Sequence, residues 1–198
     1  MESTGFGGFI SSNIDLDKDE LDKIINNCER REVKAGQFLL QSGETSMHTY
    51  YVEKGLLRKY GINEEGKESI LQFAPEKWFV TDRESMYHKR PSLYFIQALE
   101  DSKLLLIDDQ FAIRMTEKFP EFSSFNNRLL HNHIHQLTNR IYQLLSYNAE
   151  DRYLEFIKTY PDILMRVPQW MVASYLGITP ESLSRVRKNL AKKNFKPS

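Results

Sequence analysis

The sequence predicts an α+β fold, with an N-terminal antiparallel β-roll, a long central helix and a C-terminal all-α domain. Short apolar runs separated by turn residues fill positions 31–107. An apolar repeat occupies 130–144, and 169–188 has the spacing of a helix-turn-helix. We place the domain boundaries at 1–112 for the roll with its N-terminal helix, 113–147 for the dimerisation helix region and 148–198 for the helix-turn-helix domain.

The composition is typical of a folded globular protein of one large or two small domains. The chain has 198 residues, of which 40% are hydrophobic, with 27 basic side chains, 27 acidic side chains and one cysteine. No apolar run approaches the length of a membrane span, and the N-terminus lacks the basic and apolar segments of a signal peptide. We therefore expect a cytoplasmic protein with no membrane partner and no internal disulfide.

The N-terminal part combines a loose segment with one helix. Residues 1–14 are rich in glycine and serine, and we expect them to be loosely held. A helix is predicted over 17–29, because apolar residues recur there at i, i+3, i+4 and i+7. They are Leu21, Ile24, Ile25 and Cys28. On this stripe Cys28 is expected to be a small core residue rather than a reactive thiol.

Short strands are predicted through the middle of the chain, each rich in apolar, β-branched or aromatic residues. They cover 37–40, 49–53, 56–62, 69–73, 94–99 and 103–107, and glycines mark many of the turns between them. No segment between them is long enough for a crossover helix. The strands should therefore pair antiparallel in a barrel or roll.

A long helix follows, with an apolar seam spaced by four and three residues. The seam comprises Leu130, Ile134, Leu137, Ile141 and Leu144. Such a seam can pack on its own β domain or on a second chain. We favour a homodimer, because a protein that binds a two-fold DNA site gains affinity and symmetry by pairing.

Two short helices joined at Gly177 end the chain. Ala173 is small where the helices cross, Gly177 can adopt the left-handed conformation, and Thr179 can cap the second helix. The second helix then presents polar side chains that can contact DNA. The candidate DNA-binding residues are Thr179, Glu181, Ser182, Arg185, Arg187 and Lys188. An ordinary helical hairpin with a charged outer face is the alternative.

The charge distribution favours the DNA-binding interpretation. Residues 166–198 contain seven basic side chains and one acid, which leaves 20 basic and 26 acidic side chains in 1–165. A basic end on an otherwise acidic chain is typical of a phosphate-binding module. Among these bases, Lys192, Lys193 and Lys196 are expected to contact phosphates alone.

In this order of elements the chain resembles the Crp–Fnr superfamily of bacterial transcription regulators. The resemblance covers about residues 15–190 and is densest in 38–55, 63–71, 98–102 and the helix-turn-helix. It implies a cyclic-nucleotide-binding-like roll, with turns at Gly43, Gly55 and Gly66. It also implies base contacts from Glu181 and Arg185. Pro180 stands where an arginine is common, and the chain is too short for the wing found in many members.

The resemblance also identifies an effector pocket. Members that bind cyclic nucleotide carry a Gly-Glu pair and then Arg followed by Ser or Thr. Here Thr81 and Asp82 replace the first pair, and Ser92 and Leu93 replace the second. A cyclic phosphate would lose its charge-assisted arginine contact, so cyclic AMP is not expected as the effector. The pocket either binds another small molecule or is filled by side chains such as Tyr87, Leu93 and Tyr94.

Other effector chemistries and catalysis have no support in the sequence. Iron–sulfur members need four thiolates and Cys28 is alone, while His131 and His135 share a helical face with no further ligands to complete a metal site. No catalytic motif is present, so an enzyme is not expected. We therefore predict a dimeric, sequence-specific DNA-binding transcription regulator of unknown effector, with RNA polymerase as a candidate partner. The alternative is a ligand- or protein-binding sensor whose helix-turn-helix no longer binds DNA.

Overall fold

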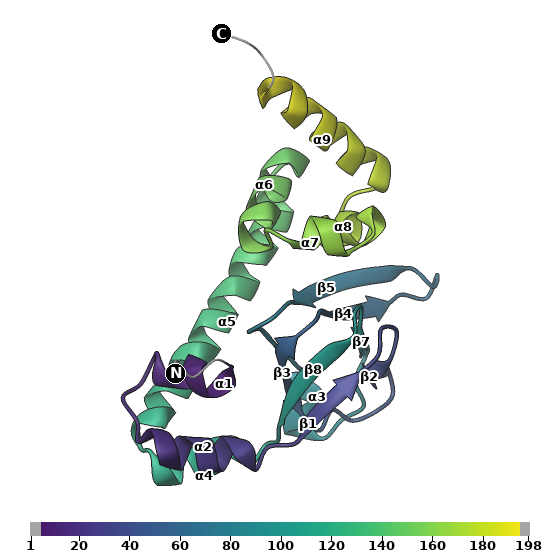
Figure 1. The fold of residues 1–198 in the computed structure, drawn as a ribbon. Coiled ribbons are helices and arrows are strands. Elements are labelled where there is room, and N and C mark those ends of the chain that lie inside the picture. The colour runs from purple at the N-terminus through teal and green to yellow at the C-terminus, as the bar shows by residue number, and fades with distance from the viewer. Residues whose placement is uncertain (1–4, 195–198) are drawn as a thin grey trace.

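The computed structural model describes residues 5–194 and contains two four-stranded antiparallel sheets that share one core (Figure 1). One sheet has the order β1-β8-β3-β6 and the other β2-β7-β4-β5. The strands are β1 (Arg30–Val33), β2 (Phe38–Leu40), β3 (Thr49–Lys54), β4 (Leu57–Ile62), β5 (Glu68–Ala74), β6 (Phe79–Val80), β7 (Tyr94–Ala98) and β8 (Ser102–Ile107). The predicted α+β class with an antiparallel roll is confirmed.

Two strands were not expected from the sequence. Strand β1 pairs with β8 along a sheet edge, and only its last residue, Val33, is buried, so it has no apolar run. Strand β6 is two residues long and pairs with Tyr50 and Tyr51 of β3. Neither carries the repeated apolar pattern by which a strand is recognised in sequence.

The expectation of a loose N-terminus is wrong for the described residues. They form α1 (Phe6–Ser11), in which Phe6 and Ile10 are buried. The Phe6 ring packs against Tyr51, Phe79 and Phe111, with ring centres 5.0–5.9 Å apart. Contacts with residues distant in sequence therefore order a segment whose glycines disfavour a helix.

The remaining helices surround the roll. They are α2 (Lys18–Asn26), α3 (Arg83–His88), α4 (Phe111–Lys118), α5 (Glu121–Ser146), α6 (Ala149–Thr159), α7 (Ile163–Arg166), α8 (Gln169–Leu176) and α9 (Pro180–Asn194). Asp17 caps α2 by accepting a hydrogen bond from the Glu20 amide at 3.0 Å. Cys28 is half-buried beside this helix, and burial raises the pKa of its thiol, as expected for a packing residue.

Turn geometry between β3 and β4 requires a glycine. Gly55 has φ +97°, and a Cβ there would lie 2.2 Å from Ser102 Oγ and 2.8 Å from Ser102 Cα. An L side chain is therefore excluded both by backbone conformation and by space. This turn leads the chain from β3 of one sheet into β4 of the other.

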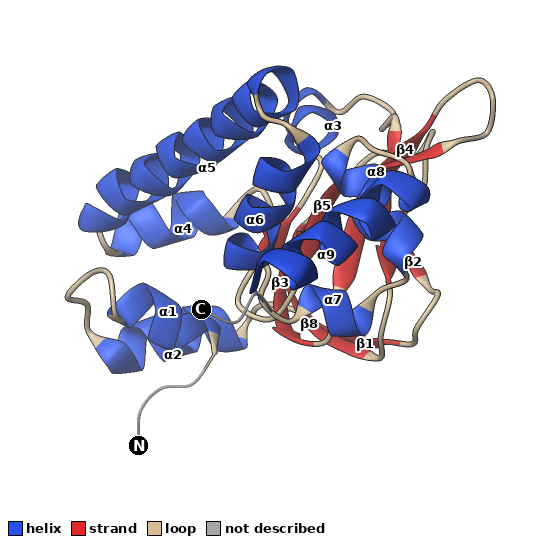
Figure 2. Ribbon diagram, turned by 90° about the horizontal axis from the view of Figure 1, so that it is seen from above, coloured by secondary structure: helices blue, strands red, loops and turns tan. Residues whose placement is uncertain are grey.

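The C-terminal helices pack on the outer face of the roll rather than standing apart from it (Figure 2). Phe73 of β5 makes aromatic contacts with Phe156, Tyr160 and Tyr175 at 5.7–6.2 Å between ring centres. Arg166 of α7 forms ion pairs with Glu76 and Glu100 of the roll. The roll and helices α6–α9 thus share one apolar cluster with a charged clamp at its margin.

Candidate nucleic-acid interface and sensor site

The turn between α8 and α9 has the hydrogen-bond pattern of a Schellman motif. The Ile178 amide donates to the Ala173 carbonyl at 3.0 Å, and the Gly177 amide donates to Ser174 at 3.1 Å. Gly177 has φ +66° and ψ +37°, which is the left-handed conformation. Ala173 is buried where a larger side chain would separate the helices. This sharp turn is compatible with a helix-turn-helix, in which two helices follow each other closely.

The outer face of α9 is accessible and locally ordered. Thr179 Oγ1 accepts a hydrogen bond from the Ser182 amide at 3.2 Å, which confirms Thr179 as the helix cap. Arg185 donates to Ser182 Oγ at 3.1 Å, so these two candidates lie side by side. Glu181, Arg185, Arg187 and Lys188 are exposed. The predicted DNA-binding residues therefore share one solvent-facing helix.

Glu181 is held in its charged form at the start of α9. Its own backbone N–H, together with the Thr179 hydroxyl, keeps the pKa of the Glu181 carboxyl below its usual range. An ionised carboxylate only accepts hydrogen bonds, so Glu181 can pair with a cytosine amino group but repels phosphate.

The lysines beyond the helix-turn-helix differ in their surroundings. Lys193 pairs with Glu150 of α6 at 2.6 Å, so an internal carboxylate competes with any phosphate contact there. Lys192 is exposed. Lys196 lies outside the described residues. Sequence reasoning missed the Lys193–Glu150 pair because 43 positions separate the two residues.

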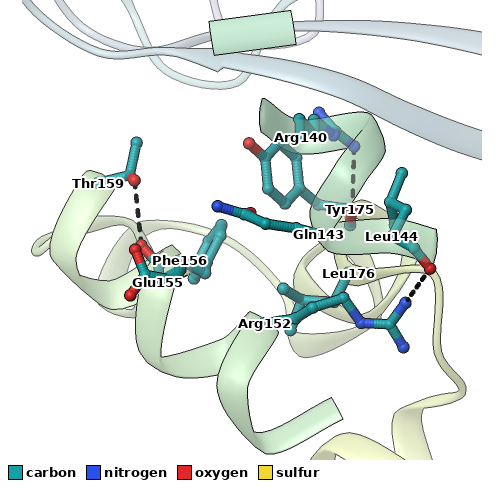
Figure 3. A pocket seen from close by; sticks show the side chains of 9 residues that line it. All are labelled: Arg140, Gln143, Leu144, Arg152, Glu155, Phe156, Thr159, Tyr175 and Leu176. Carbon is teal, nitrogen blue, oxygen red and sulfur yellow. Dashed lines mark hydrogen bonds between the residues drawn. The ribbon is translucent and has the colours of Figure 1, made fainter. Parts of the chain in front are cut away.

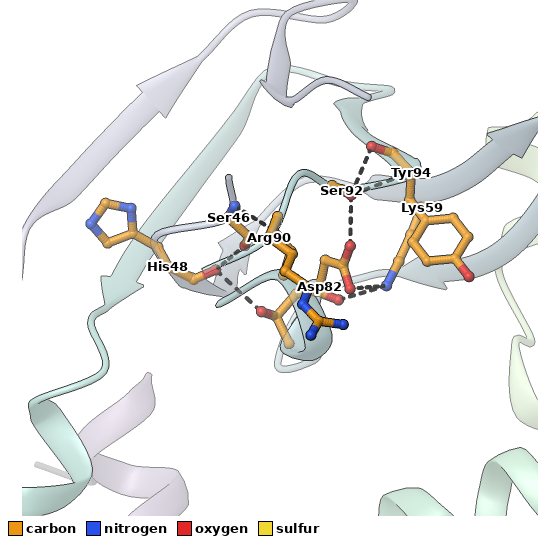
Figure 4. A network of polar contacts seen from close by, with 9 residues as sticks. Ser46, His48, Lys59, Asp82, Arg90, Ser92 and Tyr94 are labelled. Atoms are coloured by element: carbon orange, nitrogen blue, oxygen red, sulfur yellow. Dashed lines mark hydrogen bonds and ion pairs between the residues drawn. The ribbon is translucent and has the colours of Figure 1, made fainter. Parts of the chain in front are cut away.

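Most of the residues predicted to form the effector pocket are engaged in hydrogen bonds and an ion pair within the protein, and Figure 4 shows Asp82, Ser92 and Tyr94 among them. Asp82, only 4% exposed, accepts a hydrogen bond from Ser92 Oγ at 2.6 Å. Ser92 Oγ also accepts from the Tyr94 amide at 3.0 Å. The Lys59 ammonium lies 3.6 Å from Asp82 and donates to the Thr81 carbonyl at 3.0 Å. Four of the five predicted pocket residues therefore belong to one internal polar network.

The alternative in which Leu93 and Tyr87 fill this pocket is not what the structure has. Leu93 is 75% exposed and Tyr87 is 81% exposed, so both point into solvent. Tyr94 is half-buried, and its ring receives the Lys59 ammonium at 4.4 Å. Ser92 turns inward to meet Asp82, and the alternation of side chains along an extended segment then directs Leu93 outward.

Lys59 is the charged residue of this site that sequence reasoning missed. Burial lowers the pKa of its ammonium, and the nearby Asp82 opposes that shift. The available signal was its place in β4: Lys59 lies two positions from Leu57, a buried residue, and so shares its inward face.

No residue cluster in the described range suits a metal. Groups of three or more His, Cys, Asp or Glu side chains that could hold an ion are not found between residues 5 and 194.

His133 on α5 is influenced by the positive charges of Arg83 and Lys59. The side chain is exposed on its outer side, but partial desolvation first, and then these two positive charges, lower the pKa of its imidazole. None of the helices in the described part of the chain combines the length and hydropathy that crossing a bilayer requires.

Most of the predicted seam on α5 is uncovered in the single chain. Leu137 is 48% exposed and Ile141 58% exposed, and Ile134 and Leu144 are also exposed. Leu130 is half-buried. The apolar residues that α5 buries against its own chain lie nearer its start, at Phe122 and Phe125. The alternative in which the seam packs on its own β domain is therefore not what the structure has.

Comparison with known proteins extends the fold assignment to a family. Residues 30–118 match the model of the cyclic nucleotide-binding domain. The anaerobic regulatory protein of Pasteurella multocida is 29% identical over 189 residues, covering 89% of this chain and 68% of the relative. FixK2 from Bradyrhizobium japonicum superposes with a TM-score of 0.71 at 14% identity, over 86% of this chain and 89% of that one.

A Crp/Fnr-family transcriptional regulator from Eubacterium rectale superposes with a TM-score of 0.64 at 19% identity, over 93% of this chain and 88% of that one. These matches support the assignment of the chain as a Crp–Fnr family regulator. Its predicted role as a DNA-binding transcription regulator is confirmed at the level of the superfamily.

Proposed function

We propose that two copies of this superfamily member pair through α5 and bind an inverted-repeat DNA site, each copy placing α9 in a major groove. The observation that carries the proposal is the coexistence of two unpartnered surfaces on one chain. These are the exposed apolar seam of α5 and the exposed polar face of α9 beyond a Schellman turn. A two-fold dimer would bury the first surface and present the second twice.

On this proposal Arg185 contacts guanine and Glu181 contacts cytosine, while Arg187, Lys188 and Lys192 contact phosphates. Arginine forms paired hydrogen bonds to guanine O6 and N7, and glutamate accepts from the cytosine amino group. Contacts with phosphate add affinity and salt dependence without sequence information. We place the two half-sites about 34 Å apart, one turn of DNA. The protein would act in the cytoplasm by binding rather than catalysis, with RNA polymerase as a candidate partner.

The proposed sensor is a roll that does not respond to cyclic AMP. Asp82, Ser92 and Lys59 satisfy one another, and Asp82 places a carboxylate close to the region where the superfamily's phosphate would bind. We expect isothermal calorimetry to show no cyclic AMP binding with a dissociation constant below about 10⁻⁶ M, which corresponds to a binding free energy of about −8 kcal/mol. A Ser92→Arg variant should not gain tight binding, because the new guanidinium would pair with Asp82. Sub-micromolar affinity in either protein would refute this part of the proposal.

The test of DNA binding uses sheared genomic fragments and the full chain. We expect a subset of fragments to be retained and that subset to change in Arg185→Ala. Equal, salt-sensitive retention of all fragments, unaltered in Arg185→Ala, would favour the alternative of a sensor whose helix-turn-helix no longer recognises sequence.

A further inference from the structure

One arginine joins the dimerisation helix, the roll and the helix-turn-helix. Arg140 leaves α5 and donates hydrogen bonds to the carbonyl oxygens of Ile70, at 3.0 Å, and Leu71 on β5. It also donates to the Tyr175 carbonyl of α8 at 3.0 Å, and its guanidinium lies 3.7 Å from the centre of the Tyr175 ring (Figure 3). Three elements from three parts of the chain therefore meet on one side chain.

The free edge of β5 is completed by α8. β5 is the outermost strand of its sheet, so its outward backbone groups have no neighbouring strand. The Ile70 amide donates to Ser174 Oγ at 3.0 Å, and Ser174 Oγ donates to the Glu68 carbonyl at 3.0 Å. A single hydroxyl of α8 thus satisfies two backbone groups that a further strand would otherwise satisfy.

The opposite edge of β5 adjoins the polar network of the sensor. Gln72 of β5 is paired in register with Lys59 of β4, the residue that reaches Asp82. The Gln72 amide group donates to the Phe79 carbonyl at 2.7 Å, three positions before Asp82. β5 therefore runs between the sensor network on one side and the helix-turn-helix on the other.

We propose that β5 couples the sensor network to the helix-turn-helix, with Arg140 and Ser174 as the positioning residues that make α8 follow the strand. The aromatic cluster around Phe73 holds the roll and helices α6–α9 together. It does not fix their relative position, because apolar contacts are non-directional and allow sliding. Hydrogen bonds to fixed carbonyls set the register. We call the contacts of Arg140 with β5 and α8 the Arg140 joint. In sequence, Arg140 also lies between the seam residues Leu137 and Ile141, so the proposed dimer interface is next to this joint. The proposal rests on the proposed function only in its consequence, the control of DNA binding; the coupling itself does not require DNA.

The test is hydrogen exchange on the full chain without DNA, which separates it from the DNA-binding proposal. In Arg140→Gln, exchange in 68–74 and 169–177 should accelerate together by about tenfold or more, the scale of one charge-assisted hydrogen bond. Ser174→Ala should accelerate the same two segments. Arg128→Gln is the matched control: its guanidinium lies over Phe125 of the same helix, and both segments should be unaffected. Unchanged exchange in 102–107, which form β8, shows that the variants remain folded.

The coupling itself is tested from the sensor side. Lys59 lies on β4, outside the helix-turn-helix. We expect Lys59→Met to change the rate of hydrogen exchange in 169–177 by about threefold or more. In Lys59→Met/Arg140→Gln, that segment should exchange no differently from Arg140→Gln alone, since the joint is already released. Two results would overturn the proposal: a response of 68–74 without 169–177 in Arg140→Gln, or additive effects of the two substitutions on 169–177.

Discussion

Among individual residues, Arg185 and Lys192 of α9 are expected to have different roles: Arg185 should determine sequence specificity, and Lys192 should add affinity alone. Both are exposed, but Arg185 lies in the first half of α9 and is held by Ser182, whereas Lys192 lies near the end. Arg185→Ala should weaken binding to the preferred DNA by about 1–3 kcal/mol and relax specificity at one base pair per half-site. Fluorescence anisotropy against the preferred DNA and its single-base variants measures both effects.

Lys192→Ala is the control for that prediction. It should weaken all DNA sequences alike and reduce the slope of log affinity against log salt by about one. An Arg185→Ala variant that behaved in the same way would show that Arg185 contacts phosphate rather than a base.

The Asp82 carboxylate should contribute strongly to stability, because it compensates an ammonium that is largely removed from solvent. Asp82→Ala leaves Lys59 and the Ser92 hydroxyl without their buried partner, and we expect a loss of about 3–5 kcal/mol in the free energy of unfolding. Urea denaturation measures it, with the exposed Glu84→Ala as control. Adding Lys59→Met to Asp82→Ala should recover part of the loss, since the uncompensated charge is then gone. No recovery would mean that the ion pair is not the cause.

For the secondary-structure elements, the first prediction concerns the proposed dimer interface on α5. Replacing Leu137 and Ile141 by glutamate should give monomers, because a two-fold seam would then bring like charges together in an apolar contact. Sedimentation at micromolar concentration checks this, and Asn139→Glu on an exposed position of the same helix should leave the dimer intact. A monomer in the unmodified protein would contradict the dimer proposal.

The turn at Gly55 should be important for the stability of the fold. Gly55→Ala should destabilise the protein by about 2–4 kcal/mol, because left-handed strain adds to the clash with Ser102. Gly43→Ala, at φ +91° with no atom within 4 Å of the added Cβ, should cost only the strain. Equal losses by urea denaturation would show that the close approach to Ser102 relaxes freely.

Sequence pattern predicted the elements whose signal is local. The glycine turn at Gly177 and the apolar seam of α5 were expected because spacing alone encodes them. Helix α1 and strand β1 were missed because distant contacts stabilise them. The Lys59–Asp82 pair and the Arg140 joint were missed for the same reason: nothing within either segment indicates what it meets after folding.

Over the whole molecule, the charge distribution favours DNA binding through the C-terminal part of the chain. Residues 166–198 carry seven basic side chains and one acid in a chain with 27 of each. The remainder is net acidic and should repel phosphate, which favours docking through α9. Helices α6–α9 are packed on the roll, so each protomer would approach DNA as one body.

Selection from a random double-stranded DNA library tests the central claim most directly. The unmodified dimer should enrich an inverted repeat whose half-sites are centred about 34 Å apart, and Arg185→Ala should change that motif at symmetry-related positions. Enrichment of no inverted repeat, or the same motif with Arg185→Ala, would contradict the assignment of α9 as the helix that recognises DNA.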